Sequence, residues 1–185
     1  MLKQTNPIDP YAKFRRDTLR YVAVFEIKNF NDIVINYPKE AFTILVEVEE
    51  SLKEILEKKV KYKFEEVALN QNIIIKVMNE KLIIFTKSNT NLDLISILTI
   101  ASKIMSYSVS KHILMTGYLT YGHFYFNNEN NIFCGKPLVI AEQMLNSIKS
   151  CCVVCDNLVN QNVSEARVFL NDPNFFSKLE KSLIE

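Results

Sequence analysis

An apolar segment near the start of the chain gives the first structural signal. Tyr21 to Ile27 reads Tyr-Val-Ala-Val-Phe-Glu-Ile and consists mainly of β-branched and aromatic residues. Such residues favour strands, and a run without polar alternation is typical of a strand covered by other structure. We therefore predict a central strand of a sheet, with Glu26 as its one charged residue.

A helix is predicted from Pro38 to about Lys59, followed by a β-hairpin. In the helical segment, mainly apolar positions recur at intervals of three and four residues, and charged residues lie between them. These positions are Phe42, Leu45, Val46, Glu49, Leu52, Ile55 and Leu56. Two β-rich runs then follow, Asn72–Val77 and Lys81–Lys87. The three residues between them, Met78-Asn79-Glu80, have the size and chemistry of a tight hairpin turn.

The second half of the chain also alternates between predicted helices and predicted strands. A helix is expected from Leu92 to about Met105, where the apolar positions cover more than one face and indicate considerable burial. The polar segment 127–131 is typical of a hairpin loop. The other predicted elements are strands at Ile113–Tyr121 and Gly122–Phe126, a helix at Pro137–Lys149, a strand at Cys151–Cys155 and a helix at Pro173–Ile184.

The order of these elements predicts the fold class. Helices that alternate with pairs of strands indicate an α+β fold in which helices cover a mostly antiparallel sheet, built on a ferredoxin-like βαββαβ core. No linker interrupts the pattern. We expect one domain over residues 21–160, with an N-terminal extension at 1–20 and a C-terminal helical extension at 161–185.

Composition narrows the class of partners. The 185 residues are 48% hydrophobic and 23% charged, which excludes a disordered chain, and the net charge of +1 gives no general attraction to nucleic acid or to an anionic membrane. No apolar signal segment precedes Tyr21. The most lipid-like stretch, Leu94–Met105, is shorter than the roughly 20 residues of a spanning helix. We expect a cytoplasmic protein that binds neither nucleic acid nor membrane.

The four cysteines allow two interpretations. Three of them are close together, at 151, 152 and 155, and the fourth is Cys134. The spacing Cys152-x-x-Cys155 is compatible with a redox pair or half of a zinc site, although no second cysteine pair is present. The alternative is that they are small apolar residues buried on a core strand.

All three glycines fall in one short segment. Gly117, Gly122 and Gly135 are the only glycines of the chain. Glycine is used where φ is positive or where another part of the backbone approaches closely. This concentration indicates a constrained backbone, and we expect a functional site in the same region.

The segments around these glycines resemble the class III nucleotide cyclases. Met-Thr-Gly-Tyr-Leu-Thr-Tyr-Gly at 115–122 and Ile-Phe-Cys-Gly-Lys-Pro-Leu-Val-Ile-Ala-Glu at 132–142 are similar to the family's Arg-Gly-x-x-x-x-Gly and Phe-Gly-x-x-Val-x-x-Ala segments. Residues 21–30 resemble the family's first strand, which carries a metal-binding aspartate. The hairpin at 77–85 resembles the Gly-Asp turn that supplies the second aspartate, and 151–159 resembles the closing strand.

This resemblance implies a metal-dependent site. Glu26 and Glu80 fall on the two aspartate positions, where the family holds Mg²⁺ or Mn²⁺ to convert a nucleoside triphosphate into a 3′,5′-cyclic monophosphate and pyrophosphate. The resemblance also implies a homodimer, because the family completes each active site with both subunits. The positions it implies for nucleotide contacts are Ile27, Asn29, Phe30, Asn79, Thr116, Gly117 and Gly135.

The sequence also departs from the family pattern. Both glutamates are one methylene longer than aspartate, and Thr116 stands where many relatives have arginine. Val139 and Gln143 replace the asparagine and arginine that stabilise the transition state, and loss of such a donor costs on the order of 10²–10³ in rate. We therefore assign no catalytic residue.

Three functions are compatible with this incomplete set of the family's catalytic residues. The favoured one is a catalytically degenerate domain that binds a nucleotide or a protein partner as a dimer, and the alternative is an active cyclase that requires both glutamates within reach of shared metal ions. The third is an assembly protein whose dimer surface is its function. We expect this last case if the protein's own side chains fill the space beside Glu26.

Overall fold

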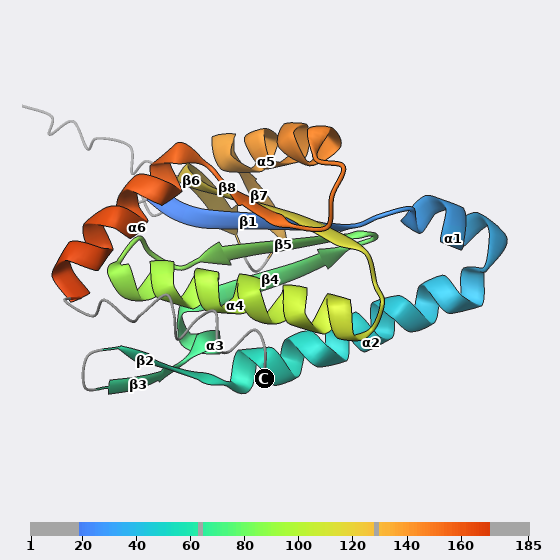
Figure 1. The fold of residues 1–185 in the computed structure, drawn as a ribbon, viewed down its shortest axis with the longest axis horizontal. Coiled ribbons are helices and arrows are strands. Elements are labelled where there is room, and N and C mark those ends of the chain that lie inside the picture. Colours follow the sequence, from blue (N-terminus) through green and yellow to red (C-terminus); the bar gives the residue numbers. More distant parts are fainter. Residues whose placement is uncertain (1–18, 63–64, 128–129, 171–185) are drawn as a thin grey trace, which may run out of the picture.

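A computed structural model describes residues 19–62, 65–127 and 130–170 of the chain (Figure 1). The elements of this part are, in order, β1 (Leu19–Ile27), α1 (Phe30–Asn36), α2 (Pro38–Glu57), β2 (Lys59–Tyr62), β3 (Glu65–Ala68), α3 (Leu69–Asn72), β4 (Ile73–Met78), β5 (Lys81–Thr86), α4 (Asn91–Ser110), β6 (Met115–Asn127), β7 (Ile132–Gly135), α5 (Lys136–Ser147), β8 (Val153–Cys155) and α6 (Asn157–Leu170).

The main sheet is built around β1. Its strand order is β4-β5-β1-β6-β7, and β1 is antiparallel to both of its neighbours. The first part of β6 also pairs with β8, which is the one parallel contact among the described strands. β2 and β3 form a separate two-stranded hairpin. The predicted class, an α+β fold with a mostly antiparallel sheet, is confirmed.

Alternation along β1 divides the core into two clusters. Ala23 and Phe25 point to the face covered by α2, α4 and α6, which holds the larger cluster. Val22 and Val24 point to the opposite face, where they pack with residues of α5. Figure 1 shows α5 above the sheet and α4 below it. Because successive strand residues alternate faces, Glu26 follows Val22 and Val24 onto the α5 face.

One predicted strand boundary was wrong. The segments Ile113–Tyr121 and Gly122–Phe126, predicted as two strands, belong to the single strand β6. Gly122 suggested a break but lies inside the strand, where a Cβ atom would come within 3.1 Å of Cγ of Pro137. The glycine therefore leaves room for the start of α5 to approach the sheet.

The helix α1, the hairpin β2–β3 and the short helix α3 were not predicted. The sequence of α1, Phe-Asn-Asp-Ile-Val-Ile-Asn, is rich in asparagine and β-branched residues, which have weak helix propensity. The chain enters α1 through Asn29, whose φ is 58°, and Pro38 at the start of α2 separates the two helices. Such short elements depend on tertiary packing for their stability.

The helix α4 is longer than predicted, at Asn91–Ser110 rather than Leu92–Met105. It begins with a capping box in which Thr90 and Asp93 exchange hydrogen bonds between side chain and backbone. By length and composition α4 could cross a membrane, but half of its apolar window is buried inside the protein. Its side chains Leu94, Ile97 and Ile100 lie in the larger core cluster. The core of the fold therefore accounts for its hydrophobicity.

Other boundaries differ by a few residues from the predictions. The structure has α5 at Lys136–Ser147 and β8 at Val153–Cys155, so the chain from Ile148 to Cys152 connects them. The predicted helix at Pro173–Ile184 lies outside the described residues. The predicted extension at 161–185 begins inside α6, which continues from Asn157 to Leu170.

Candidate functional site

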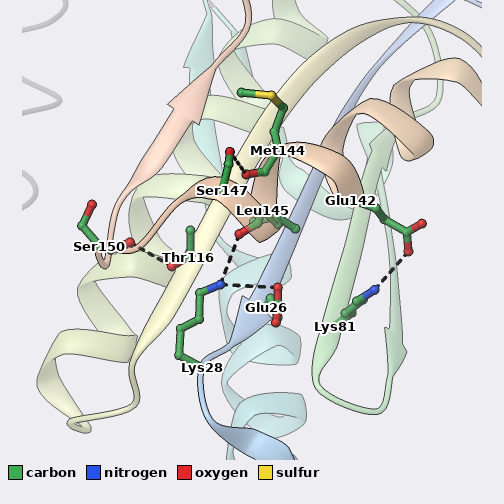
Figure 2. Close-up of polar contacts among 9 residues, drawn as sticks. All are labelled: Glu26, Lys28, Lys81, Thr116, Glu142, Met144, Leu145, Ser147 and Ser150. Atoms are coloured by element: carbon green, nitrogen blue, oxygen red, sulfur yellow. Dashed lines mark hydrogen bonds and ion pairs between the residues drawn. The ribbon is translucent and has the colours of Figure 1, made fainter.

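Three polar residues share one face of the sheet where β1 ends. Glu26 pairs in register with Lys81 of β5 on one side and with Thr116 of β6 on the other. Directly paired residues in antiparallel strands point to the same face. All three side chains therefore lie on the face covered by α5, and Figure 2 shows them beneath that helix.

Lys28 supplies the contact that organises this corner. Its Nζ atom lies 3.5 Å from Oε2 of Glu26 and donates a hydrogen bond of 3.3 Å to the carbonyl oxygen of Leu145 (Figure 2). Both charged side chains are about a quarter exposed. Leu145 lies in the last turn of α5, whose final carbonyl groups have no partner within the helix. The last turn of α5 contains no basic residue, so Lys28 provides the positive charge that such a terminus favours.

A second ion pair links α5 to the neighbouring strand. Nζ of Lys81, the first residue of β5, lies 3.1 Å from Oε1 of Glu142 in α5 (Figure 2). This lysine is about a third exposed and the glutamate nearly half exposed, so the pair adds little to stability by itself. Together with Lys28, it attaches α5 to the ends of both β1 and β5.

The two candidate metal ligands come to the same corner through the backbone. Glu80 lies in the turn between β4 and β5, and its carbonyl oxygen accepts a hydrogen bond of 2.9 Å from the N–H of Ile27. Glu26 and Glu80 are both half-buried. Neither belongs to a group of three or more metal-ligating side chains in the part of the chain that the structure describes.

The carboxylates as arranged do not fit a pair of divalent ions. The ammonium group of Lys28 lies 3.5 Å from Oε2 of Glu26, and it would repel a divalent ion bound to the same carboxylate. An ammonium group held in this way already neutralises the carboxylate. The chain therefore supplies its own cation at this position, and we derive no reaction step through Mg²⁺ or Mn²⁺.

The predicted nucleotide contacts on β6 are engaged within the protein. The hydroxyl of Thr116 is fully buried and donates a hydrogen bond of 2.9 Å to the carbonyl oxygen of Ser150 (Figure 2). The N–H of Gly117 donates to the carbonyl oxygen of Cys152 at 2.9 Å. A Cβ atom at Gly117 would lie 2.6 Å from the ring of Phe25, so this glycine allows close packing of the core.

The other predicted contacts lie in turns or close to them. Asn29 and Asn79 are exposed, with positive φ angles of 58° and 50°. Ile27 and Phe30 are buried. Gly135 has an extended backbone at the start of α5, where a Cβ atom would come within 2.5 Å of the carbonyl oxygen of His123.

None of the three glycines has a positive φ angle. All three are instead places where another part of the chain approaches closely, which was one of the two roles predicted for them. The glycine-rich segment is therefore constrained by packing. Its contacts connect β6 to α5 and to β8.

The cysteines are all free thiols and differ in exposure. Cys134 and Cys151 are exposed, so the prediction that they are buried was wrong for these two. Cys152 and Cys155 are partly buried, and Cys155 packs against the larger core cluster. Burial raises the pKa of the Cys155 thiol, and the neighbouring Asp156 carboxylate adds to this effect. A raised pKa disfavours the thiolate and therefore reactivity.

Three important residues of this corner were not identified from the sequence. Lys28, Lys81 and Glu142 were not singled out, although Lys28 lies two residues after Glu26, the same-face spacing of a strand. The contact between Lys28 and Leu145 depends on how α5 lies on the sheet, so no local pattern in the sequence predicts it.

Comparisons with known proteins add no further assignment, because no protein-family model matches the chain and no curated protein is similar to it.

Proposed function

We propose that this chain is a class III nucleotide cyclase-like domain that has lost metal-dependent catalysis and acts as a homodimeric binding module. The strand order β4-β5-β1-β6, with neighbouring strands antiparallel, supports a ferredoxin-like core. In this core, β1 and β4 are joined through helices, as are β5 and β6. With the β2–β3 hairpin taken as an insertion between β1 and β4, this connectivity supports the βαββαβ arrangement that the resemblance implies.

The observation that carries the proposal is the ammonium group of Lys28 beside Glu26. A charged side chain of the protein lies beside the carboxylate to which the resemblance assigns a metal. The same ammonium group is bonded to the end of α5, so displacing it would also leave the Leu145 carbonyl without this partner. The remaining family positions agree with lost catalysis, because Val139 and Gln143 are exposed on α5 and neither carries a charge.

The net charge of the corner favours protein contacts over nucleotide binding. Glu26, Glu80 and Glu142 outnumber Lys28 and Lys81, and a surplus of negative charge disfavours a triphosphate without metal ions. We therefore assign the binding role to a protein surface, and nucleotide binding without turnover becomes an outcome of the test.

Exposed apolar side chains lie on both of the elements that the Lys81–Glu142 pair connects, α5 and the β4–β5 hairpin. Val139 and Met144 of α5 are 54% and 38% exposed, and Met78, which pairs in register with Lys81 and shares its face, is 48% exposed. Apolar residues together with one acidic and one basic group can be self-complementary, which a symmetric dimer requires. The occupant that this face fits is a second copy of the chain.

The catalytic part of the proposal is tested with nucleotides and manganese. Incubation with each of the four ribonucleoside triphosphates and Mn²⁺ is expected to give no cyclic monophosphate or pyrophosphate by mass spectrometry. Product that disappears in Glu26→Ala would instead establish the alternative, an active cyclase, which is favoured only by the shared corner of Glu26 and Glu80. Binding of a triphosphate without product would identify a nucleotide-binding domain.

The role of Lys28 has a direct test. Lys28→Met keeps most of the aliphatic chain but removes the ammonium group, so we expect Mn²⁺ affinity to rise at least about tenfold, which corresponds to about 1.4 kcal/mol. Electron paramagnetic resonance of free Mn²⁺ measures this change. Lys81→Met is the matched control, because it removes the other lysine of the corner and frees Glu142, while the Lys28–Glu26 pair stays in place. Equal Mn²⁺ affinity in the two variants would show that Lys28 does not block a metal position.

The dimer is tested by a charge on the apolar face. Val139→Asp is expected to weaken self-association by about 2 kcal/mol or more, because a desolvated carboxylate at an interface core is costly. Light scattering coupled to gel filtration over a range of concentrations measures the mass. Leu158→Asp, on the exposed side of α6, is the control. A wild-type chain that stays monomeric at high concentration would contradict the dimer.

A further inference from the structure

The end of α4 has a residue that its backbone conformation does not favour. His112 has a φ angle of 56°, its N–H donates to the carbonyl oxygen of Val109 at 3.2 Å, and the N–H of Ile113 donates to that of Ser108 at 2.8 Å. These two bonds form the Schellman motif that ends many helices. Glycine is the usual residue at this left-handed position, because a side chain there is strained.

A second residue with a left-handed backbone conformation lines the same cavity as His112. Asn29, between β1 and α1, has a φ angle of 58°. Asn29 and His112 both line a cavity of about 360 Å³ formed by the end of β1, α1, α2 and the connection from α4 to β6. Figure 1 shows this connection running beside α2. Strained backbone positions are retained most often where a ligand or a mechanism needs them.

The lining of the cavity combines an apolar floor with a polar rim. Ile27, Ile33, Ile44 and Ile113 form apolar parts of its wall. At the rim, Lys111 lies next to His112, and its Nζ atom is 3.8 Å from Oε2 of Glu47. At this distance the pair is loose, and both side chains are about half exposed, so the lysine can reorient toward a ligand.

We propose that this cavity binds a small aliphatic carboxylate. The isoleucine side chains contact the hydrocarbon chain, and the carboxylate accepts hydrogen bonds from the Lys111 ammonium and the His112 imidazole. The volume is typical of small-molecule sites, and three of its lining residues, Lys28, Lys111 and His112, can donate hydrogen bonds to an anion. The strain at His112 is then the cost of placing an imidazole at the rim where glycine would be more stable. Lys28 lines this cavity as well as contacting Glu26, so the two sites adjoin, but the binding proposed here does not depend on the proposed function.

The binding test uses octanoate as the probe and 1-octanol as its uncharged counterpart. Titration of the ¹⁵N-labelled full chain, followed by amide chemical shifts, is expected to move the signals of Ile113 and Leu114 with octanoate, and octanol is expected to bind at least about tenfold more weakly. Lys111→Gln is expected to lose about tenfold in octanoate affinity, the equivalent of one charged hydrogen bond, and to leave octanol binding unchanged.

A variant at His112 separates binding from folding. His112→Gly is expected to weaken octanoate at least about tenfold while raising the Tm by about 2–4 °C, because it relieves the backbone strain. Asn131→Gly is the matched control: it relaxes a left-handed residue in the β6–β7 hairpin, so octanoate affinity stays unchanged. Equal binding of octanoate and octanol, no shift at the cavity, or a lower Tm in His112→Gly would each overturn the proposal.

Discussion

Replacing Phe85 by alanine is expected to lower the free energy of unfolding by about 3–5 kcal/mol, the range for deletion of a buried phenylalanine. Phe85 is completely buried, and its ring centroid lies 4.9 Å from that of Phe124 and 5.0 Å from that of Phe126. The three rings belong to the smaller cluster, beneath α5. Removing the central ring would leave a cavity that the flanking strands of the sheet cannot close.

Chemical denaturation followed by circular dichroism measures this loss. Phe85→Leu is the matched variant, because it retains much of the apolar volume, and it is expected to cost only about 1–1.5 kcal/mol. Because α5 packs on this cluster, Phe85→Ala is also expected to loosen the contact between Lys28 and Leu145. A loss below about 1.5 kcal/mol for the alanine variant would mean that α5 is not fixed by the aromatic rings.

Gly135→Ala is expected to destabilise the protein by about 3 kcal/mol, at the upper end of overpacking effects. The new Cβ atom would lie 2.5 Å from the carbonyl oxygen of His123 and 2.9 Å from Cα of Phe124. Both are backbone atoms of β6, so neither can move aside by a change of rotamer. The strand β7 would have to separate from β6 at the point where α5 begins.

Gly122→Ala is the control for this prediction. Its Cβ atom would meet Cγ of Pro137 at 3.1 Å, and a proline ring can adjust its pucker. We expect a change within about 1 kcal/mol, because the loss of contact is partly offset by the lower entropy of the unfolded chain. Thermal unfolding of the two variants side by side measures the difference. Equal effects would show that the approach of β7 to β6 is not tight.

The sequence predicted the parts of the fold that have strong local signals. The continuous apolar run of β1 and the tight turn before Lys81 were both placed correctly within a few residues. The break predicted at Gly122 was wrong because a glycine has the same sequence signal whether it turns the chain or allows a neighbour to approach. That distinction depends on Pro137, which lies in another element.

The candidate site was less accessible to sequence reasoning than the fold. The resemblance singled out Glu26 and Glu80, but their chemistry depends on Lys28 and on a carbonyl group at the far end of α5, 117 residues away in sequence. The charge balance of a site is a property of the packed structure. Residue types along the sequence therefore did not indicate that the carboxylate of Glu26 is paired with a lysine.

The central position of β1 has a consequence for how the protein is made. Val22 pairs with Phe85 on one side and with Thr120 on the other, so neither partner has been synthesised when β1 leaves the ribosome. Pairings between such distant segments form slowly, and an unpaired apolar strand is prone to aggregation while it waits. The segment that is most protected in the folded protein is therefore the one that stays longest without partners during translation.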